Sequence, residues 1–209
     1  MEESEARAWV QAQFNVPRET MDRLDAFAAL LTEENLRQNL ISRSSAASLW
    51  TRHIADSAQL LLFSPPHPGS WVDLGSGAGF PGLIVAALHH GPVTLVEERK
   101  LRIEFLRHAA QLLGVEKKTE ILAARAERLP RRTFDVISAR AFARLPRLID
   151  LGTRFSTAKT RWILPKGRNA QSELEAAESS WQGDFRLEPS LTDADARIIV
   201  AEGVKRKRG

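Results

Sequence analysis

A glycine-rich stretch over residues 72–82 combines residue types that could hold a nucleotide-like cofactor. Asp73 ends a short apolar run and is followed by closely spaced glycines, namely Gly75, Gly77, Gly79 and Gly82. When a strand runs into such a loop and then into a helix, a ligand can approach bare backbone at the helix N-terminus. Glu97 closes the next apolar run, where a carboxylate can accept hydrogen bonds from ribose hydroxyls. The sequence therefore predicts a nucleotide-like binding site.

Two cofactor classes fit this loop. The register Gly77-x-Gly79-x-x-Gly82 fits the dinucleotide fingerprint of a nicotinamide oxidoreductase. The register that begins at Asp73 resembles the first motif of class I S-adenosylmethionine methyltransferases. Asp73 favours the second, because its carboxylate suits the methionine ammonium of that cofactor, directly or through water. Glu97 supports both classes, and a glycine-rich turn without a ligand is the structural alternative.

The surrounding pattern predicts an α/β fold. Residues 1–62 have helical spacing, with a last helix from Ser44 or Ser45 to about Phe63, and a Pro/Gly-rich linker follows at 64–70. Strands are then predicted at 71–74, 93–96, 120–123, 134–138, 162–164, 184–188 and 197–201, and helices at 81–90, 100–113, 146–155 and 170–180. This alternation predicts a doubly wound, mostly parallel sheet with an antiparallel strand near the end. We expect a helical extension over 1–66 and a cofactor-binding domain over 67–209.

Charge is unevenly distributed along the chain. The formal net charge is +4, but residues 117–168 contain fourteen Lys and Arg against four Asp and Glu. Such an asymmetry favours a surface that faces a polyanion. A solvated face that acidic segments balance in three dimensions is the alternative. The basic end, Lys205 to Arg208, is expected to be a disordered tail that adds non-specific affinity for RNA.

Composition excludes several kinds of site. The chain contains no cysteine and no tyrosine, so disulfides, thiolate metal sites and a cysteine nucleophile are ruled out, and no metal cluster is evident. The acidic, polar start is unlike a secretory signal, and no apolar run approaches the ~20 residues that a bilayer requires. We therefore expect a cytoplasmic protein without membrane contact.

Several uncommon strings in one order carry a family resemblance. The chain resembles the RsmG (GidB) family of bacterial small-subunit rRNA guanine-N7 methyltransferases. The strings are Asn-Leu-Ile-Ser at 39–42, Arg-His-Ile-Ala-Asp-Ser at 52–57, Gly-Ser-Gly-Ala-Gly-Phe-Pro-Gly at 75–82, Lys100 with Phe105-Leu106, Ala-Arg-Ala-Phe-Ala at 139–143, and Pro-Lys-Gly at 165–167. Where the family usually has Asp followed by Ser after the second strand, this chain has Glu97-Glu98.

The resemblance implies a class I S-adenosylmethionine-dependent methyltransferase. Its reaction would be methyl transfer to N7 of one guanine, position 527 in the usual count, in the decoding-region loop of 16S rRNA. The candidate cofactor residues are Asp73, Gly75, Gly77, Gly79, Phe80, Glu97, Glu98, Ala126, Glu127 and Arg140. The candidate RNA contacts are Arg131, Arg132, Arg144, Arg147, Lys166, Arg168 and Arg197. The expected partner is 16S rRNA or the small subunit, and we expect a monomer. Methylation of another RNA or a small molecule, or a non-catalytic nucleotide-binding module, are the alternatives.

Guanine N7 carries a lone pair and no proton, so its methylation needs no general base and can rely on proximity and orientation. Arg140 lies just past a predicted strand, where α/β sheets bind ligands, and is our candidate for an orienting catalytic residue. Phe142 could stack on a flipped guanine or pack in the core. His53, Asp56 and Ser57 share one helix face and, from spacing alone, predict a packing and capping set.

Overall fold

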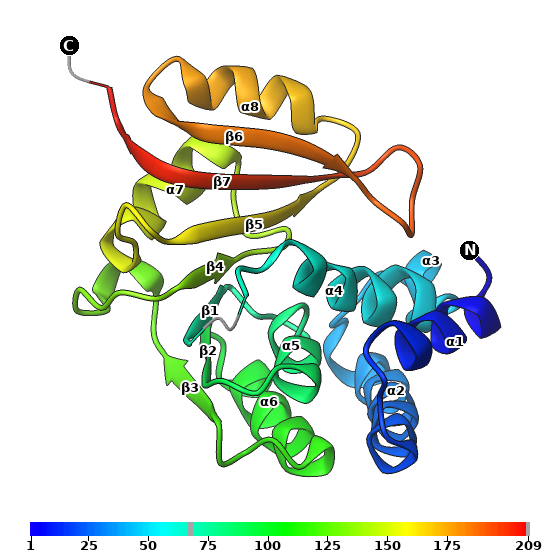
Figure 1. The fold of residues 1–209 in the computed structure, drawn as a ribbon. Helices are drawn as coiled ribbons and strands as arrows, with labels where there is room; N and C mark the ends of the chain where they lie inside the picture. Colours follow the sequence, from blue (N-terminus) through cyan, green and yellow to red (C-terminus); the bar gives the residue numbers. More distant parts are fainter. Residues whose placement is uncertain (67–68, 208–209) are drawn as a thin grey trace.

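A seven-stranded sheet forms the centre of the protein, which we describe from a computed structural model covering residues 1–66 and 69–207. The strand order is β3-β2-β1-β4-β5-β7-β6 (Figure 1). The strands are β1 (Trp71–Leu74), β2 (Val93–Glu97), β3 (Thr119–Ala123), β4 (Val136–Ser138), β5 (Arg161–Lys166), β6 (Trp181–Pro189) and β7 (Arg197–Arg206). The first five are parallel, and β7 runs antiparallel to both β5 and β6. The predicted doubly wound sheet with an antiparallel strand near its end is confirmed.

The sheet is covered on both faces, which explains why its central strands are apolar without alternation. Every residue of β1 and β2 is buried. Helices α5 (Gly82–Leu88) and α6 (Lys100–Leu113) share one apolar core with the N-terminal helices, whereas α7 (Leu145–Gly152) and α8 (Ala170–Glu178) share a second core across the sheet (Figure 1). Trp71 faces the first core and Val72 the second, because neighbouring residues of a strand point to opposite faces.

The N-terminal segment packs on the first core. It comprises α1 (Glu3–Gln13), α2 (Arg18–Gln38), α3 (Arg43–Ala46), a π-helix (Trp50–Ala55), α4 (Asp56–Ala58) and a 3-10 helix (Gln59–Phe63). The Phe27 ring of α2 lies 5.6 Å from the Phe80 ring and 6.3 Å from the Phe105 ring. The prediction of a single helix from Ser44 or Ser45 to Phe63 is therefore wrong. This segment instead contains short α-, π- and 3-10 helices. The predicted domain boundary, between residues 66 and 67, borders residues outside the described part.

The C-terminal end differs from the expected tail. Lys205 and Arg206 belong to β7, and Arg206 donates to Asp150 across 3.0 Å. Its guanidinium also lies 4.9 Å from the centre of the Trp181 ring. Strand pairing and these contacts order the first half of the basic end, so the expectation of a disordered tail is wrong for Lys205 and Arg206; Arg208 lies outside the described residues. Within the described chain, no helix is long and apolar enough to cross a membrane.

Candidate functional site

The glycine loop joins β1 to α5 in a conformation that suits glycine. Gly75, Gly77 and Gly79 have φ angles of 72°, 56° and 91°, in the left-handed region. The backbone N–H groups of Gly75 and Ser76 donate to the Val96 carbonyl, at 2.9 and 3.0 Å, and tie the loop to the end of β2. A Cβ on Gly79 would lie 2.4 Å from a methyl group of Leu83, so this glycine also permits close packing of the helix.

Asp73 lies beneath this loop and is fully buried. Its Oδ2 accepts from the Gly82 N–H at 3.2 Å, and its Oδ1 accepts from the Ser138 hydroxyl at 2.9 Å. Burial raises the pKa of this carboxyl to about 6, although the hydrogen bond from Ser138 opposes that rise. Asp73 therefore fastens the end of β1 to the start of α5 and to β4. Its carboxylate presents no exposed surface for the ammonium group expected to bind it.

Glu97, at the end of β2, is also buried. Its Oε2 accepts from the Gly77 N–H at 3.0 Å, and its Oε1 accepts from the N–H groups of Glu98 and Arg99 at 2.9 Å. Glu98 is exposed and forms an ion pair of 2.6 Å with Arg125. The Glu97 carboxylate thus holds the loop in shape, whereas the Glu98 carboxylate lines the space in front of the loop.

A groove of about 520 Å³ opens in front of the loop. Its lining includes five of the candidate cofactor residues, namely Gly75, Glu97, Glu98, Ala126 and Glu127. The chemistry of this lining fits S-adenosylmethionine: carboxylates can accept from ribose hydroxyls, and Val96, Ala126 and Leu151 offer apolar surface to an adenine. The other candidates, which are Asp73, Gly77, Gly79, Phe80 and Arg140, are absent from the described lining of this groove.

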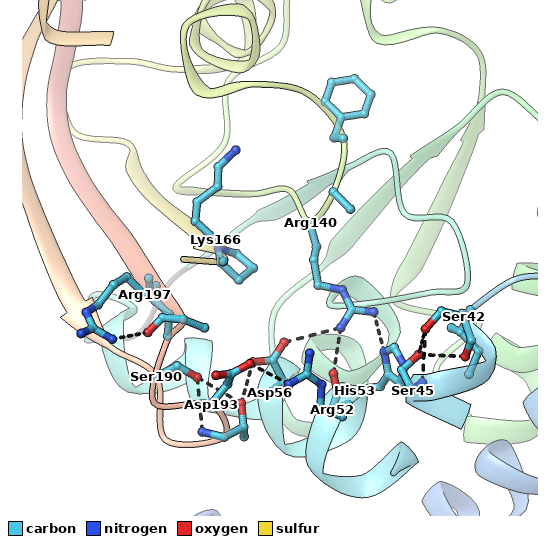
Figure 2. A pocket seen from close by; sticks show the side chains of 18 of the residues that line it. Ser42, Ser45, Arg52, His53, Asp56, Arg140, Lys166, Ser190, Asp193 and Arg197 are labelled. Atoms are coloured by element: carbon cyan, nitrogen blue, oxygen red, sulfur yellow. Dashed lines mark hydrogen bonds and ion pairs between the residues drawn. The ribbon is translucent and has the colours of Figure 1, made fainter. Parts of the chain in front are cut away.

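Arg140 follows β4 and points toward the N-terminal π-helix (Figure 2). Its Nη2 lies 2.9 Å from His53 Nδ1, and its Nη1 donates to the Arg52 carbonyl at 3.2 Å and to Asp56 Oδ2 at 3.5 Å. The guanidinium also stands 4.9 Å from the centre of the Phe80 ring. Desolvation lowers the pKa of Arg140, while Asp56 and Asp73 oppose that change, and the group stays charged at neutral pH.

His53 supports Arg140 as a neutral acceptor. Burial lowers its pKa to about 3, helped by the positive charges of Arg140 and Arg52. The ring stacks on Phe80 with centres 4.9 Å apart and planes inclined at 25°. Since Nδ1 accepts from Arg140, the proton resides on Nε2, which is buried and has no hydrogen-bond partner in the described chain.

A second cavity, of about 660 Å³, lies beside Arg140. It opens between the π-helix, the end of β5 and the β6–β7 connection (Figure 2). Five basic residues line it, namely Arg52, Arg140, Arg144, Lys166 and Arg197, together with the acidic residues Asp56, Glu173 and Asp193. Residues 141–143 line both this cavity and the groove, so the segment forms a shared wall between them. Ala141 within it has a φ of 51°, a left-handed conformation that non-glycine residues rarely adopt.

Comparison with known proteins places this chain in a family. The family model described as rRNA small subunit methyltransferase G (GidB) matches residues 20–196. A protein named ribosomal RNA small subunit methyltransferase G from Rhizorhabdus wittichii is 53% identical over 98% of this chain and 94% of its own length. The protein of the same name from Zymomonas mobilis is 47% identical over 100% of this chain and 97% of its own. The chain belongs to the GidB family.

Solved structures support the fold of this GidB-family protein. An O-methyltransferase from Bacillus cereus in complex with SAH superposes with a TM-score of 0.61 at 16% identity, covering 87% of this chain and 90% of that one. A ribosomal protein L11 methylase from Lactobacillus delbrueckii gives 0.59 at 18% identity, covering 75% and 79%. At these identities the likeness shows the class I methyltransferase fold alone. Family and fold together make the chain an S-adenosylmethionine-dependent methyltransferase.

The candidate RNA-binding residues of this GidB-family protein fall into two groups. Arg144, Lys166 and Arg197 line the cavity, whereas the other four lie outside it: Arg131, Arg132, Arg147 and Arg168. Arg132 pairs with Glu120 and Arg147 with Glu127 and Asp150, so acidic neighbours partly balance the basic segment. Lys166 is only 11% exposed and is paired with Glu173, so it lies inside the cavity rather than on the open surface.

Sequence reasoning missed the β6–β7 connection as part of the site. Thr192 donates to Asp56 Oδ1 at 2.9 Å, and Arg52 pairs with Asp193 at 2.6 Å. The Leu191 N–H also donates to the Gln59 side chain at 2.8 Å. These contacts join residues more than 130 positions apart, and no local spacing could have revealed them. Of the predicted packing and capping set, Ser57 caps none of the described helix ends: its hydroxyl donates to the His53 carbonyl at 2.6 Å within the helical segment. Asp56 and His53 instead reach Arg140.

Proposed function

We propose that this protein transfers a methyl group from S-adenosylmethionine to N7 of a guanine, position 527, in the decoding-region loop of 16S rRNA. It would act as a monomer in the cytoplasm, on RNA or on the small subunit. The observation that carries the proposal is the shared wall at residues 141–143, with a cofactor-sized groove on one side and a basic cavity on the other. The base and the donor would bind on either side of this segment, and N7 would contact the methyl group at its edge.

The chain's residues suit a reaction that needs placement rather than proton transfer. N7 attacks with a lone pair, and the bond from the methyl carbon to sulfur breaks as the new bond to N7 forms, so no proton leaves the base. The cofactor would supply the electrophilic methyl group. Arg140, fixed by His53 and Asp56, lines the cavity and would orient the base there. The groove residues Glu97, Glu98, Ala126 and Glu127 would hold the cofactor.

Cations around the cavity support an RNA substrate. Arg144 lines the cavity and is exposed, and Arg168 is exposed one residue after the lining residue Gly167. Arg197 lines the cavity from the start of β7. Arginines at such a rim can bind phosphates and leave the base free to enter. Further away, Arg131 is exposed next to Arg154 and would extend the contact along the RNA.

Mapping of the transferred methyl group tests the proposal. Small-subunit RNA from a strain that lacks the enzyme would be incubated with the protein and S-adenosylmethionine carrying tritium in its methyl group, then cleaved chemically at N7-methylguanine. Label at one guanine of the decoding-region loop is the expected result. Label in another RNA, transfer only to small molecules, or thermal stabilisation by S-adenosylmethionine without any transfer would each refute the assignment.

A further inference from the structure

Lys166 occupies a special place in the cavity because its ammonium touches the shared wall. The residue ends β5, and its side chain extends along the cavity (Figure 2). Its Nζ donates to the Ala143 carbonyl at 3.0 Å and to Glu173 Oε2 at 2.9 Å. An ammonium has three N–H donors, so two are used and one remains for a ligand. The same Glu173 oxygen accepts from the Leu145 N–H at 2.9 Å, which fixes the pair to the start of α7.

The chemistry of N7 transfer decides which edge of a purine faces this wall. If N7 must point toward the groove, its neighbour on the six-membered ring, the group on C6, must also lie near the wall. In guanine that group is the O6 acceptor, and in adenine it is an amino donor. A fixed cation at the wall would therefore bind guanine and repel adenine.

The other cations of the cavity are less suited to this task. Arg140 directs its terminal nitrogens to His53, Asp56 and the Arg52 carbonyl, toward the π-helix. Arg144 is exposed at the rim. Arg197 donates to the carbonyls of Ala194 and Ala196, in the β6–β7 connection. Lys166 is the cavity cation that is nearly buried and hydrogen-bonded to a wall carbonyl.

We propose that Lys166 reads the O6 atom of the target guanine and so selects guanine over adenine, with Glu173 holding the ammonium in place. The inference rests on the proposed function. It gives the candidate RNA contact Lys166 a role at the base. Glu173 acts on the base only through Lys166 and is a positioning residue.

Atom-level changes in the target base, combined with a Lys166 variant, test the proposal. Three RNAs would carry guanine, inosine or 2-aminopurine at the target position. Inosine keeps O6 and lacks the 2-amino group, whereas 2-aminopurine lacks O6 and the N1 proton. The wild-type protein should methylate inosine RNA nearly as well as guanine RNA, and should lose roughly tenfold to a hundredfold in kcat/KM on 2-aminopurine RNA, as expected for one hydrogen bond to a charged donor.

In Lys166→Met, kcat/KM on guanine RNA should fall by a similar factor, while the value on 2-aminopurine RNA should change little. The ratio between the RNAs should therefore shrink toward one. Lys166→Arg, which keeps a cationic donor, should restore part of the preference. Because Lys166→Met leaves Glu173 without its partner, the double variant Lys166→Met with Glu173→Gln provides the same comparison with a neutral pair.

Lys159→Met is the matched control, since Lys159 is exposed just before β5 and Lys166 ends the same strand. It should keep the wild-type ratio. Two results in both Lys166→Met and the double variant would contradict a contact between Lys166 and O6. One is an equal loss of kcat/KM on all three RNAs, and the other is an unchanged ratio of kcat/KM between guanine RNA and 2-aminopurine RNA. A wild-type protein that methylates no guanine N7 would instead refute the proposed function itself, so the two failures can be told apart.

Discussion

Arg140 and His53 meet at 2.9 Å, and this contact joins the end of β4 to the N-terminal π-helix. It depends on a neutral imidazole, because a protonated ring would place two cations side by side. Burial provides that neutrality by lowering the pKa of His53 to about 3. The orientation of the candidate catalytic arginine is therefore set by a residue outside the cofactor-binding fold.

The buried histidine predicts a specific dependence of stability on pH. Its folded-state pKa of about 3 lies below the ordinary value of 6.5, so the unfolded chain binds a proton first as pH falls. The stability contribution is complete above about pH 6.5 and is lost progressively toward pH 3. At pH 5 the loss is about 2 kcal/mol. His53→Gln keeps an acceptor but does not titrate, so urea unfolding at pH 7.5, 6 and 5 should show a shallower decline than for wild type. Parallel declines would contradict a neutral His53.

Arg140 itself should be sensitive even to a conservative change. A lysine ammonium cannot reach His53, Asp56 and the Arg52 carbonyl together, since it lacks the planar fork of a guanidinium. We expect Arg140→Lys and Arg140→Ala to lose about 10²-fold or more in single-turnover methyl transfer at saturating RNA, with much smaller effects on RNA affinity. The wild-type rate should show no titration of a catalytic base near neutrality. Full activity of Arg140→Lys would reduce Arg140 to a point charge.

Gly75 should be indispensable for cofactor binding. Its φ of 72° disfavours other residues, and an added Cβ would lie 2.3 Å from the Phe142 ring in the shared wall. Gly75→Ala should abolish the rise in melting temperature that S-adenosylmethionine or its demethylated product produces. Gly203→Ala is the control, because Gly203 has a φ of 62° but nothing within 4 Å of an added Cβ. If Gly75→Ala shows the same cofactor-induced shift as that control, the loop does not form the cofactor wall.

RNA binding should depend on salt through the rim of the cavity. Replacing both Arg144 and Arg168 with glutamine should lower the slope of log affinity against log salt by about 1 for each phosphate that is no longer bound. Arg18→Gln removes an exposed charge at the first residue of α2, whereas the cavity-lining Leu40 follows the other end of that helix, so the slope should stay unchanged. Filter binding of small-subunit RNA over a range of salt concentrations measures this. Equal slopes in all proteins would mean that phosphates do not bind at this rim.

Shortening the C-terminus tests the structural role of Lys205 and Arg206. Truncation after Val204 removes Lys205 and Arg206, which pair with Gln182 and Trp181 of β6. We expect the melting temperature to fall by about 5 °C, corresponding to roughly 2 kcal/mol in a chain of this size. Truncation after Arg206 retains those pairs and should leave the melting temperature close to that of wild type. A similar loss in both truncations would place the stabilising contacts beyond β7.

The sequence was a good guide wherever function imposes a local pattern. Glycines at fixed spacing after an apolar run predicted the loop between β1 and α5, and the alternation of strands with helices predicted a mostly parallel sheet. Patterns of this kind act through backbone conformation and burial of neighbouring residues. For the same reason they could not show that Asp73 is sealed beneath the loop, since its burial depends on Ser138 from β4.

The cavity was less predictable because its parts come from distant segments. His53 and Asp56 have the spacing of packing residues, and only the folded chain brings Arg140 against them; the partner of Arg52 is Asp193, 141 positions away. Charge counting found the basic segment but could not separate the rim arginines from Arg132, whose charge Glu120 offsets. Long-range pairing, rather than local propensity, decides these roles.

The position of β7 has a consequence for how the enzyme is made. The strand follows β6 in the chain, yet it lies between β5 and β6 and, together with the connection before it, brings Asp193 and Arg197 to the cavity. During synthesis the N-terminal parts of a protein emerge first and can begin to fold. A nascent chain can therefore assemble the five parallel strands and the glycine loop, but β6 has no neighbour until β7 has emerged. On the proposed assignment, the groove for the methyl donor can thus form earlier in synthesis than the cavity for the base, and a growing chain would acquire its cofactor site before it could act on ribosomal RNA.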